Sequence, residues 1–118
     1  MTTVYGLANC DTVKRARAWL AGQGVDARFH DLRRDGLPAG ALARWLAAAG
    51  RERLVNRQGT TWRKLDDAQR ALAESDATVA ALLSANPSCI RRPVVEWPDG
   101  RITVGFDAED WSRRMQAR

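Results

Sequence analysis

Residues 2–32 read "TTVYGLANCDTVKRARAWLAGQGVDARFHDL", and this stretch decides the fold. Its first five residues predict a short strand that ends at Gly6. A helix follows, capped by Asp11 or Thr12, because apolar residues then recur at helical spacing until "GQG" stops it. The alternating run 26–32 predicts a second strand. A strand, a helix and a strand within about 30 residues form a βαβ unit, whose two strands run parallel.

The middle of the chain is predicted to be helical. Residues 42–49 carry an apolar stripe at helical spacing that ends at Gly50. Residues 66–75 and 77–87 predict two more helices, the second stopped by an Asn-Pro pair. Between these helical segments, turn residues gather around Gly59.

The C-terminal part predicts a β-hairpin followed by a helix. Residues 94–95 and 102–104 are short apolar runs, and the Pro-Asp-Gly sequence at 98–100 supplies the turn that joins them. Residues 107–118 predict a final helix with Asp107 as its N-cap. The hairpin and this helix complete a β-β-α unit.

The order β-α-β, a helical insert at about 36–88 and β-β-α is that of the thioredoxin fold, an α/β fold with a mixed sheet. At 118 residues we expect a single domain over 1–118. No apolar run approaches the roughly 20 residues that span a bilayer, and no secretory signal opens the chain. We therefore expect a cytoplasmic protein that does not engage membranes.

The charge and the cysteines exclude several kinds of site. The net charge of +5 comes from scattered arginines rather than a basic tract with interleaved aromatics, so direct nucleic-acid binding is not expected. The spacing of Cys10, Cys89 and His30 fits no zinc pattern, so no metal is expected. No bound cofactor is predicted either.

Cys10 has two interpretations on its position alone: a reactive thiolate or a small residue in a turn. A free cysteine is mostly protonated at neutral pH, but the N–H groups and dipole at a helix start favour the charged thiolate. Lys14 and Arg15 add positive charge in the first turn. Cys89, near the end of a predicted helix, is interpreted first as a small buried residue and second as an internal partner for Cys10.

Arg92 precedes Pro93, and a proline at this place opens a strand. An arginine fixed beside a thiolate favours the charged sulfur and binds a carboxylate or an oxyanion with two hydrogen bonds. Trp62, within the polar stretch 59–65, either packs the insert against the sheet or lines the cleft beside Cys10. The sequence leaves both possibilities open.

Five blocks, "YGLANCDTVKRARAWL", "FHDLRRDGL", "GTTWRKL", "RRPVV" and "VGFDAEDW", together resemble the arsenate reductase-like (ArsC) family, and in particular its YffB-type branch. The resemblance covers essentially the whole chain. It implies a thioredoxin-like fold with a cis-proline at Pro93. It also implies a glutathione-dependent thiol reductase, with Cys10 as nucleophile and glutathione, or a glutaredoxin-like thiol, resolving the adduct from outside.

The same resemblance assigns the remaining site residues. Thr12 matches the threonine that follows the nucleophile, Arg92 matches the arginine before the strand proline, and both are expected to bind substrate or glutathione together with Pro93. Arg57 matches a second arginine from the insert, although the alignment can slip by one residue onto Asn56. The physiological substrate is not indicated.

Two alternatives come from other branches of the family. Arsenate reduction itself is disfavoured, because a histidine of the cysteine loop is replaced by Gly6 and a third arginine by Gly105. The Spx-type regulators bind RNA polymerase as protein partners and sense oxidants through a CxxC motif. Val13 stands where the second cysteine of that motif would be, so this switch is excluded while a protein-binding role stays open.

Overall fold

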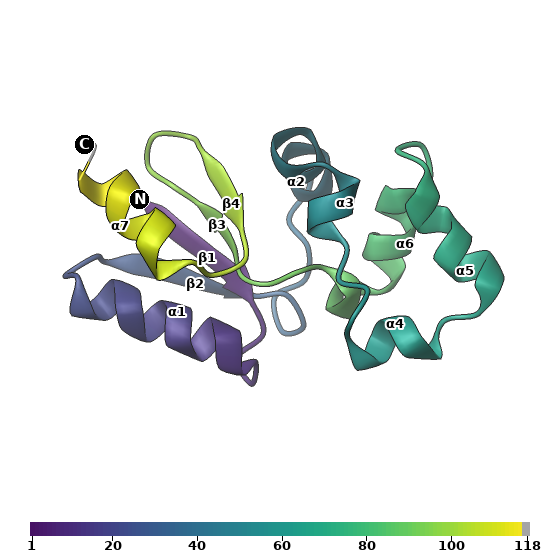
Figure 1. Ribbon diagram of the computed structural model, residues 1–118, viewed down its shortest axis with the longest axis horizontal. Helices are drawn as coiled ribbons and strands as arrows, with labels where there is room; N and C mark the ends of the chain where they lie inside the picture. The colour runs from purple at the N-terminus through teal and green to yellow at the C-terminus, as the bar shows by residue number, and fades with distance from the viewer. Residues whose placement is uncertain (117–118) are drawn as a thin grey trace.

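The computed structural model describes residues 1–116 (Figure 1). The strands are β1 (Thr2–Gly6), β2 (Ala27–Asp31), β3 (Val94–Glu96) and β4 (Ile102–Val104). The α-helices are α1 (Asp11–Gly22), α2 (Ala41–Ala49), α3 (Arg51–Leu54), α4 (Thr60–Lys64), α5 (Asp67–Ala71), α6 (Val79–Ala85) and α7 (Ala108–Gln116). Two short 3-10 helices are η1 (Leu72–Glu74) and η2 (Pro87–Cys89).

The four strands form one mixed sheet in the order β2-β1-β3-β4. β1 and β2 run parallel, as the βαβ unit predicts, while β3 is antiparallel to both β1 and β4. The hairpin turns at Gly100, whose φ of +88° suits a glycine and whose N–H donates to the Trp97 carbonyl at 2.9 Å. This arrangement confirms the predicted α/β, thioredoxin-like fold.

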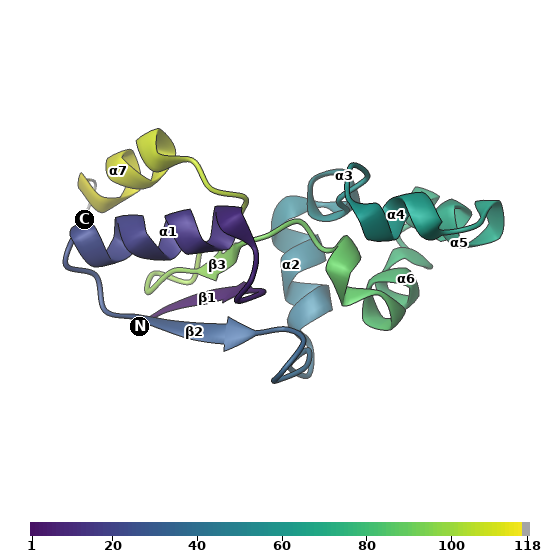
Figure 2. The same cartoon turned by 90° about the horizontal axis from the view of Figure 1, so that it is seen from below.

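Strand alternation divides the core between the two faces of the sheet. Val4 and Val95 face α1 and α7, and together with Trp111 they form one buried cluster. Figure 2 shows α1 and α7 on the same side of the sheet. Tyr5 and Trp45 belong to a second cluster, which joins the sheet to the helices between β2 and β3.

The insert is more finely divided than its sequence pattern predicts. The helix expected over 66–75 is α5 followed by η1, and the stretch around Gly59 that was expected to turn contains α4. Neither α3 nor α4 was predicted, because helices of four and five residues are too short to show a full apolar stripe. Such short helices depend on tertiary packing for their stability.

Asp107 caps α7 as predicted, because its carboxylate accepts a 3.0 Å hydrogen bond from the Asp110 N–H. The last two residues of the helix predicted over 107–118 lie outside the described residues. Within the described range, no helix combines the length and the apolar character needed to cross a membrane.

A close contact fixes how α1 leaves the sheet. β1 ends at Gly6, where an added Cβ would lie 2.6 Å from Cγ2 of Val13, closer than side chains approach one another. Val13 is completely buried, and its β-branched side chain has little freedom to turn away. Gly6 therefore lets the first turn of α1 approach the end of β1, immediately beside Cys10.

Candidate active site

Cys10 is the N-cap residue of α1, with extended backbone angles of −87° and 124°. Its carbonyl accepts the first helical hydrogen bond, from the Lys14 N–H at 2.9 Å. The predicted caps, Asp11 and Thr12, are wrong, because both residues already belong to the helix. Within the described residues, no side-chain hydrogen bond caps this helix, so the half-buried Cys10 sulfur lies at its positive end beside backbone N–H groups that lack a helical partner.

The buried carboxylate of Asp31, at the end of β2, holds the loop that carries Cys10. Its Oδ2 accepts a 3.1 Å hydrogen bond from the Ala8 N–H in that loop. Its Oδ1 accepts from the N–H groups of Arg33 at 2.8 Å and Arg34 at 3.0 Å. These bonds, that of Arg34 above all, lower the pKa of the Asp31 carboxyl. Asp31 thus ties the cysteine loop to the end of the sheet.

Replacing Asp31 with asparagine is expected to lower the free energy of unfolding at pH 7 by about 1–3 kcal/mol, because an amide cannot accept all three N–H bonds. The lowered pKa in the folded protein means that the carboxylate stabilises the fold above its ordinary value of 3.8. That contribution is lost as the pH falls through the folded-state pKa. The gap between wild type and Asp31→Asn should therefore close at acidic pH.

Urea unfolding of both proteins at a series of pH values measures this difference. Asp26→Asn, an exposed aspartate just before β2, is the matched control and should leave stability unchanged. A gap that stays constant down to the lowest pH would show that the Asp31 carboxylate does not contribute in this way.

A pocket of about 360 Å³ opens beside Cys10. It is lined by Cys10, Thr12, Arg53, Asn56, Arg91, Arg92, Gly105 and Phe106. Three of these residues are arginines and none is acidic. The pocket therefore suits an anion or a ligand with carboxylates next to the sulfur.

Hydrogen bonds to backbone carbonyls orient the three arginines. Arg92 Nη1 donates to the carbonyls of Ser88 at 2.7 Å and Ile90 at 3.2 Å. Arg53 Nη2 donates to the Val104 carbonyl at 2.7 Å, and Arg91 Nε donates to the Arg53 carbonyl at 2.8 Å. The Arg92 Nε is buried and has no hydrogen-bond partner among the described residues.

Gly105 makes room for Arg53. Its φ is +89°, a conformation that favours glycine, and an added Cβ would lie 3.2 Å from Arg53 Nη2. Arg53 thus places a guanidinium beside Gly105, the position at which the arsenate reductases of the family, by resemblance, carry an arginine that this chain lacks. No sequence pattern marks Arg53 or Arg91 as a site residue, although Arg91 directly precedes Arg92 and Pro93 in the chain.

The structure brings Cys10, Thr12 and Arg92 together, and it confirms the cis Arg92–Pro93 peptide bond. Arg57 lies elsewhere: its guanidinium is 3.6 Å from carboxylate oxygens of both Glu52 and Glu74. Asn56, the residue reached by the one-residue slip, lines the pocket in its place.

Trp62 packs against the larger core cluster, and the guanidiniums of Arg57 and Arg70 lie over its ring. This position agrees with the packing interpretation. Cys89 is 1% exposed, and burial raises the pKa of its thiol against a smaller opposing effect of Arg92. A raised pKa disfavours the thiolate, so Cys89 is a poor nucleophile.

The chain that forms this pocket is similar over nearly its whole length to known proteins. The sequence pattern of the ArsC family matches residues 5–114. The solved structure of the YFFB protein is 42% identical, covers 96% of this chain and 97% of its own, and superposes with a TM-score of 0.88. The solution structure of an arsenate reductase (ArsC) related protein from Brucella melitensis is 43% identical over 98% of this chain and 94% of its own, with a TM-score of 0.72.

Among curated sequences, the global transcriptional regulator Spx of Streptococcus pyogenes is 29% identical over 112 residues. That alignment covers 93% of this chain and 81% of the regulator. Similarity across nearly the whole chain thus extends both to an arsenate reductase-related protein and to a regulator.

Proposed function

The chain belongs to the YffB-type branch of the ArsC family, and from this we propose that it is a thiol-dependent oxidoreductase with the Cys10 thiolate as nucleophile. One observation carries the proposal: Cys10 lies at the uncapped start of α1, in a pocket with three arginines. The positive end of the helix dipole lies at the sulfur, and the arginines attract an anionic substrate to it. We place this reaction in the cytoplasm, where thiols are kept reduced.

The proposed substrate is a mixed disulfide between glutathione and another thiol. The Cys10 thiolate attacks the glutathione sulfur, a Cys10–glutathione disulfide forms, and the other thiol leaves as a thiolate that takes up a proton. The thiolate of a second glutathione then attacks the glutathione sulfur of this adduct. Glutathione disulfide forms and the Cys10 thiolate is restored, so in sum one free glutathione thiol is oxidised to the disulfide and the other thiol of the substrate is released in reduced form.

Glutathione fits the pocket by charge. Its two carboxylates are complementary to the positive charges of Arg53, Arg91 and Arg92, which line the pocket together with Cys10. The hydroxyl of Thr12, in the first turn of α1, adds a hydrogen-bonding group. Arg57 is a secondary candidate for the same role, since reaching the pocket would require it to leave Glu52 and Glu74.

Mass spectrometry of the protein after exposure to glutathione disulfide tests the proposal. We expect one glutathione per chain, mapped to the peptide that contains Cys10 and removed by added glutathione. The Cys89→Ala variant should form the same adduct, and Cys10→Ser should form none. An adduct on Cys89, or no adduct at all, would contradict the proposal.

Arg92 is expected to contribute mainly to the binding of the anion. Replacing it with lysine keeps the charge but loses the planar group that binds a carboxylate with two hydrogen bonds. We expect kcat/KM for a glutathionylated peptide to fall by roughly 10-fold to 100-fold, mostly through KM. Arg63→Lys, in α4 away from the pocket lining, is the control. An unchanged KM in Arg92→Lys would remove Arg92 from the binding site.

The similarity to Spx favours a second candidate function, binding of a protein partner as a regulator. Val13 replaces the second cysteine of the CxxC switch, so such a regulator would act without an internal disulfide at this place. A partner that is retained equally by wild type and Cys10→Ser in a pull-down would support this role. Partner binding that requires the free Cys10 thiol would contradict it.

A further inference from the structure

Two hydrogen bonds hold Arg91, one of the pocket arginines beside Cys10, to the end of α3. Its backbone N–H donates to the Leu54 carbonyl at 2.7 Å, and its Nε donates to the Arg53 carbonyl at 2.8 Å. Its terminal nitrogens, Nη1 and Nη2, bond to no other residue that the structure describes, and no described carboxylate pairs with them. These two nitrogens therefore form a free two-donor edge on a side chain that is already fixed in place.

Arg92 is held by a different set of carbonyls. Its Nη1 donates to those of Ser88 and Ile90, which leaves the edge formed by Nε and Nη2. The Nε of this edge is buried without a hydrogen-bond partner in the described part of the chain, and such buried donors are rare in folded proteins. Arg34 shows how an edge of this kind binds a carboxylate, because its Nε and Nη2 each donate to one oxygen of Asp35 at 3.0 Å. The free edge of Arg92 therefore suits a carboxylate of a ligand.

Arg53, the third arginine of the pocket, differs from the other two because it is exposed, whereas Arg91 and Arg92 are half-buried. Its Nη2 already donates to the Val104 carbonyl at 2.7 Å. Solvent and salt weaken the pairing of an exposed charge with an anion, so we assign Arg53 a general attraction of anions rather than a defined contact. Only its backbone carbonyl holds Arg91, so the Arg53 side chain can be replaced without releasing that neighbour.

We propose that Arg91 and Arg92 each bind one carboxylate of the same ligand, so that the pocket selects thiols with two carboxylates over thiols with one or none. This inference rests on the proposed function and deepens it, since glutathione carries one carboxylate on its glycine and one on its γ-glutamyl residue. Two arginine edges with separate anchors suit two separate carboxylates, whereas a single edge is enough for one compact oxyanion. Mixed disulfides of cysteine and of cysteamine, with one carboxylate and none, are therefore expected to be poorer substrates than those of glutathione.

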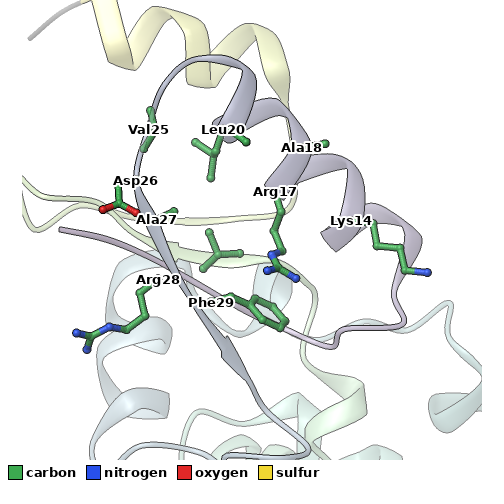
Figure 3. A pocket seen from close by; sticks show the side chains of 11 residues that line it. Lys14, Arg17, Ala18, Leu20, Val25, Asp26, Ala27, Arg28 and Phe29 are labelled. Atoms are coloured by element: carbon green, nitrogen blue, oxygen red, sulfur yellow. The ribbon is translucent and has the colours of Figure 1, made fainter.

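A second cavity, of about 490 Å³ between α1 and β2, does not offer the same arrangement (Figure 3). The Arg17 guanidinium in its lining lies over the Phe29 ring, 4.0 Å from the ring centre. The cations of this cavity share the lining with the carboxylate of Asp26, which opposes a ligand of two negative charges. We therefore expect dicarboxylate thiols to bind beside Cys10 and not beside Phe29.

Titration calorimetry with S-methylglutathione, whose sulfur is blocked, tests this selection apart from any reaction of Cys10. The comparison ligand is the ethyl ester of S-methylglutathione at the glycine carboxylate, which removes one negative charge and keeps the rest of the molecule. We expect the ester to bind the wild-type protein roughly tenfold or more weakly than the acid, because one arginine edge loses its carboxylate. In NMR spectra the acid should shift the amide signals of Cys10 and Thr12 and leave that of Phe29 unchanged.

Replacing the two arginines one at a time identifies the edge that binds the glycine carboxylate. In one of the variants Arg91→Ala and Arg92→Ala, the acid and the ester should bind equally, and in the other the full difference between them should remain. Arg53→Ala is the matched control, because it removes the same charge from the same pocket. It should weaken the binding of both ligands by the same factor.

Equal binding of acid and ester by the wild-type protein would overturn the inference, and no folding defect of a variant could account for that result. A difference between the two ligands that survives in both variants would also overturn it. So would shifts at Phe29 in place of Cys10, or no binding of the acid at millimolar concentration. Failure of the proposed redox function is recognised separately, by the absence of a glutathione adduct on Cys10.

Discussion

Replacing Cys10 with serine is expected to abolish reduction of a glutathionylated peptide, with kcat/KM falling by roughly a thousandfold or more. A serine hydroxyl occupies nearly the same volume at the start of α1 but cannot form the disulfide on which both steps depend. Formation of glutathione disulfide, followed in a coupled assay, measures the effect. The fold should be unaffected, because the Cys10 side chain makes no capping hydrogen bond.

Cys89 supplies the matched comparison for this result. It is buried in the larger cluster, and Cys89→Ala should retain most of the activity while losing some stability. Equal loss of activity in the two variants would mean that the reaction uses both thiols. Full activity in Cys10→Ser would rule out the proposed nucleophile.

Trp45 is expected to give the largest stability effect among the core residues considered. It is completely buried in α2, its ring centre lies 4.9 Å from that of Tyr5, and its Nε1 donates to Glu96 Oε2 at 2.8 Å. Trp45→Ala should lower the free energy of unfolding by about 3–5 kcal/mol, since it leaves a large cavity between the insert and the sheet. Urea unfolding followed by far-UV circular dichroism measures this loss.

Two further variants separate the contributions at this site. Trp45→Phe keeps an aromatic ring but loses the hydrogen bond to Glu96, which retains its 3.1 Å contact with Arg44. It should therefore lose clearly less stability than Trp45→Ala. Trp62→Ala, which removes a half-buried ring, should also cost less. A Trp45→Ala loss no larger than that of Trp62→Ala would contradict the central role given to α2.

The parts of the fold that follow from local sequence were predictable. The βαβ unit is encoded by strand alternation and helical spacing within residues 2–32, and the hairpin by a Pro-Asp-Gly turn. Both can therefore be recognised from short stretches of sequence. The insert was predicted only as helical. The bounds of α3 and α4 depend on contacts with distant segments, such as the pairing of Val55 with Ile90, which no local pattern shows.

The site shows the same division between local and distant information. Cys10 and Thr12 occupy one helix start, and Arg92 precedes a proline, so a local pattern identifies each of them. Arg53 reaches the pocket from α3 only because the chain at Gly105 lies against it, a contact between residues far apart in sequence. Asn56 and Arg57 are neighbours in the chain, yet Asn56 lines the pocket while Arg57 lies against Glu52 and Glu74. An alignment that can slip by one residue does not distinguish between the two.

The contact between Gly6 and Val13 links two substitutions that look independent in the sequence. By resemblance, arsenate reductases carry a histidine at the position of Gly6, and the oxidant-sensing regulators carry a cysteine at the position of Val13. Because a Cβ at position 6 would lie 2.6 Å from a methyl group of Val13, position 6 cannot gain a side chain while Val13 keeps its place. The two sites are therefore epistatic in one direction: loss of the branched side chain at 13 removes the contact that opposes a Cβ at 6. A mutational route from this protein toward the arsenate reductases has a preferred order, in which position 13 changes first.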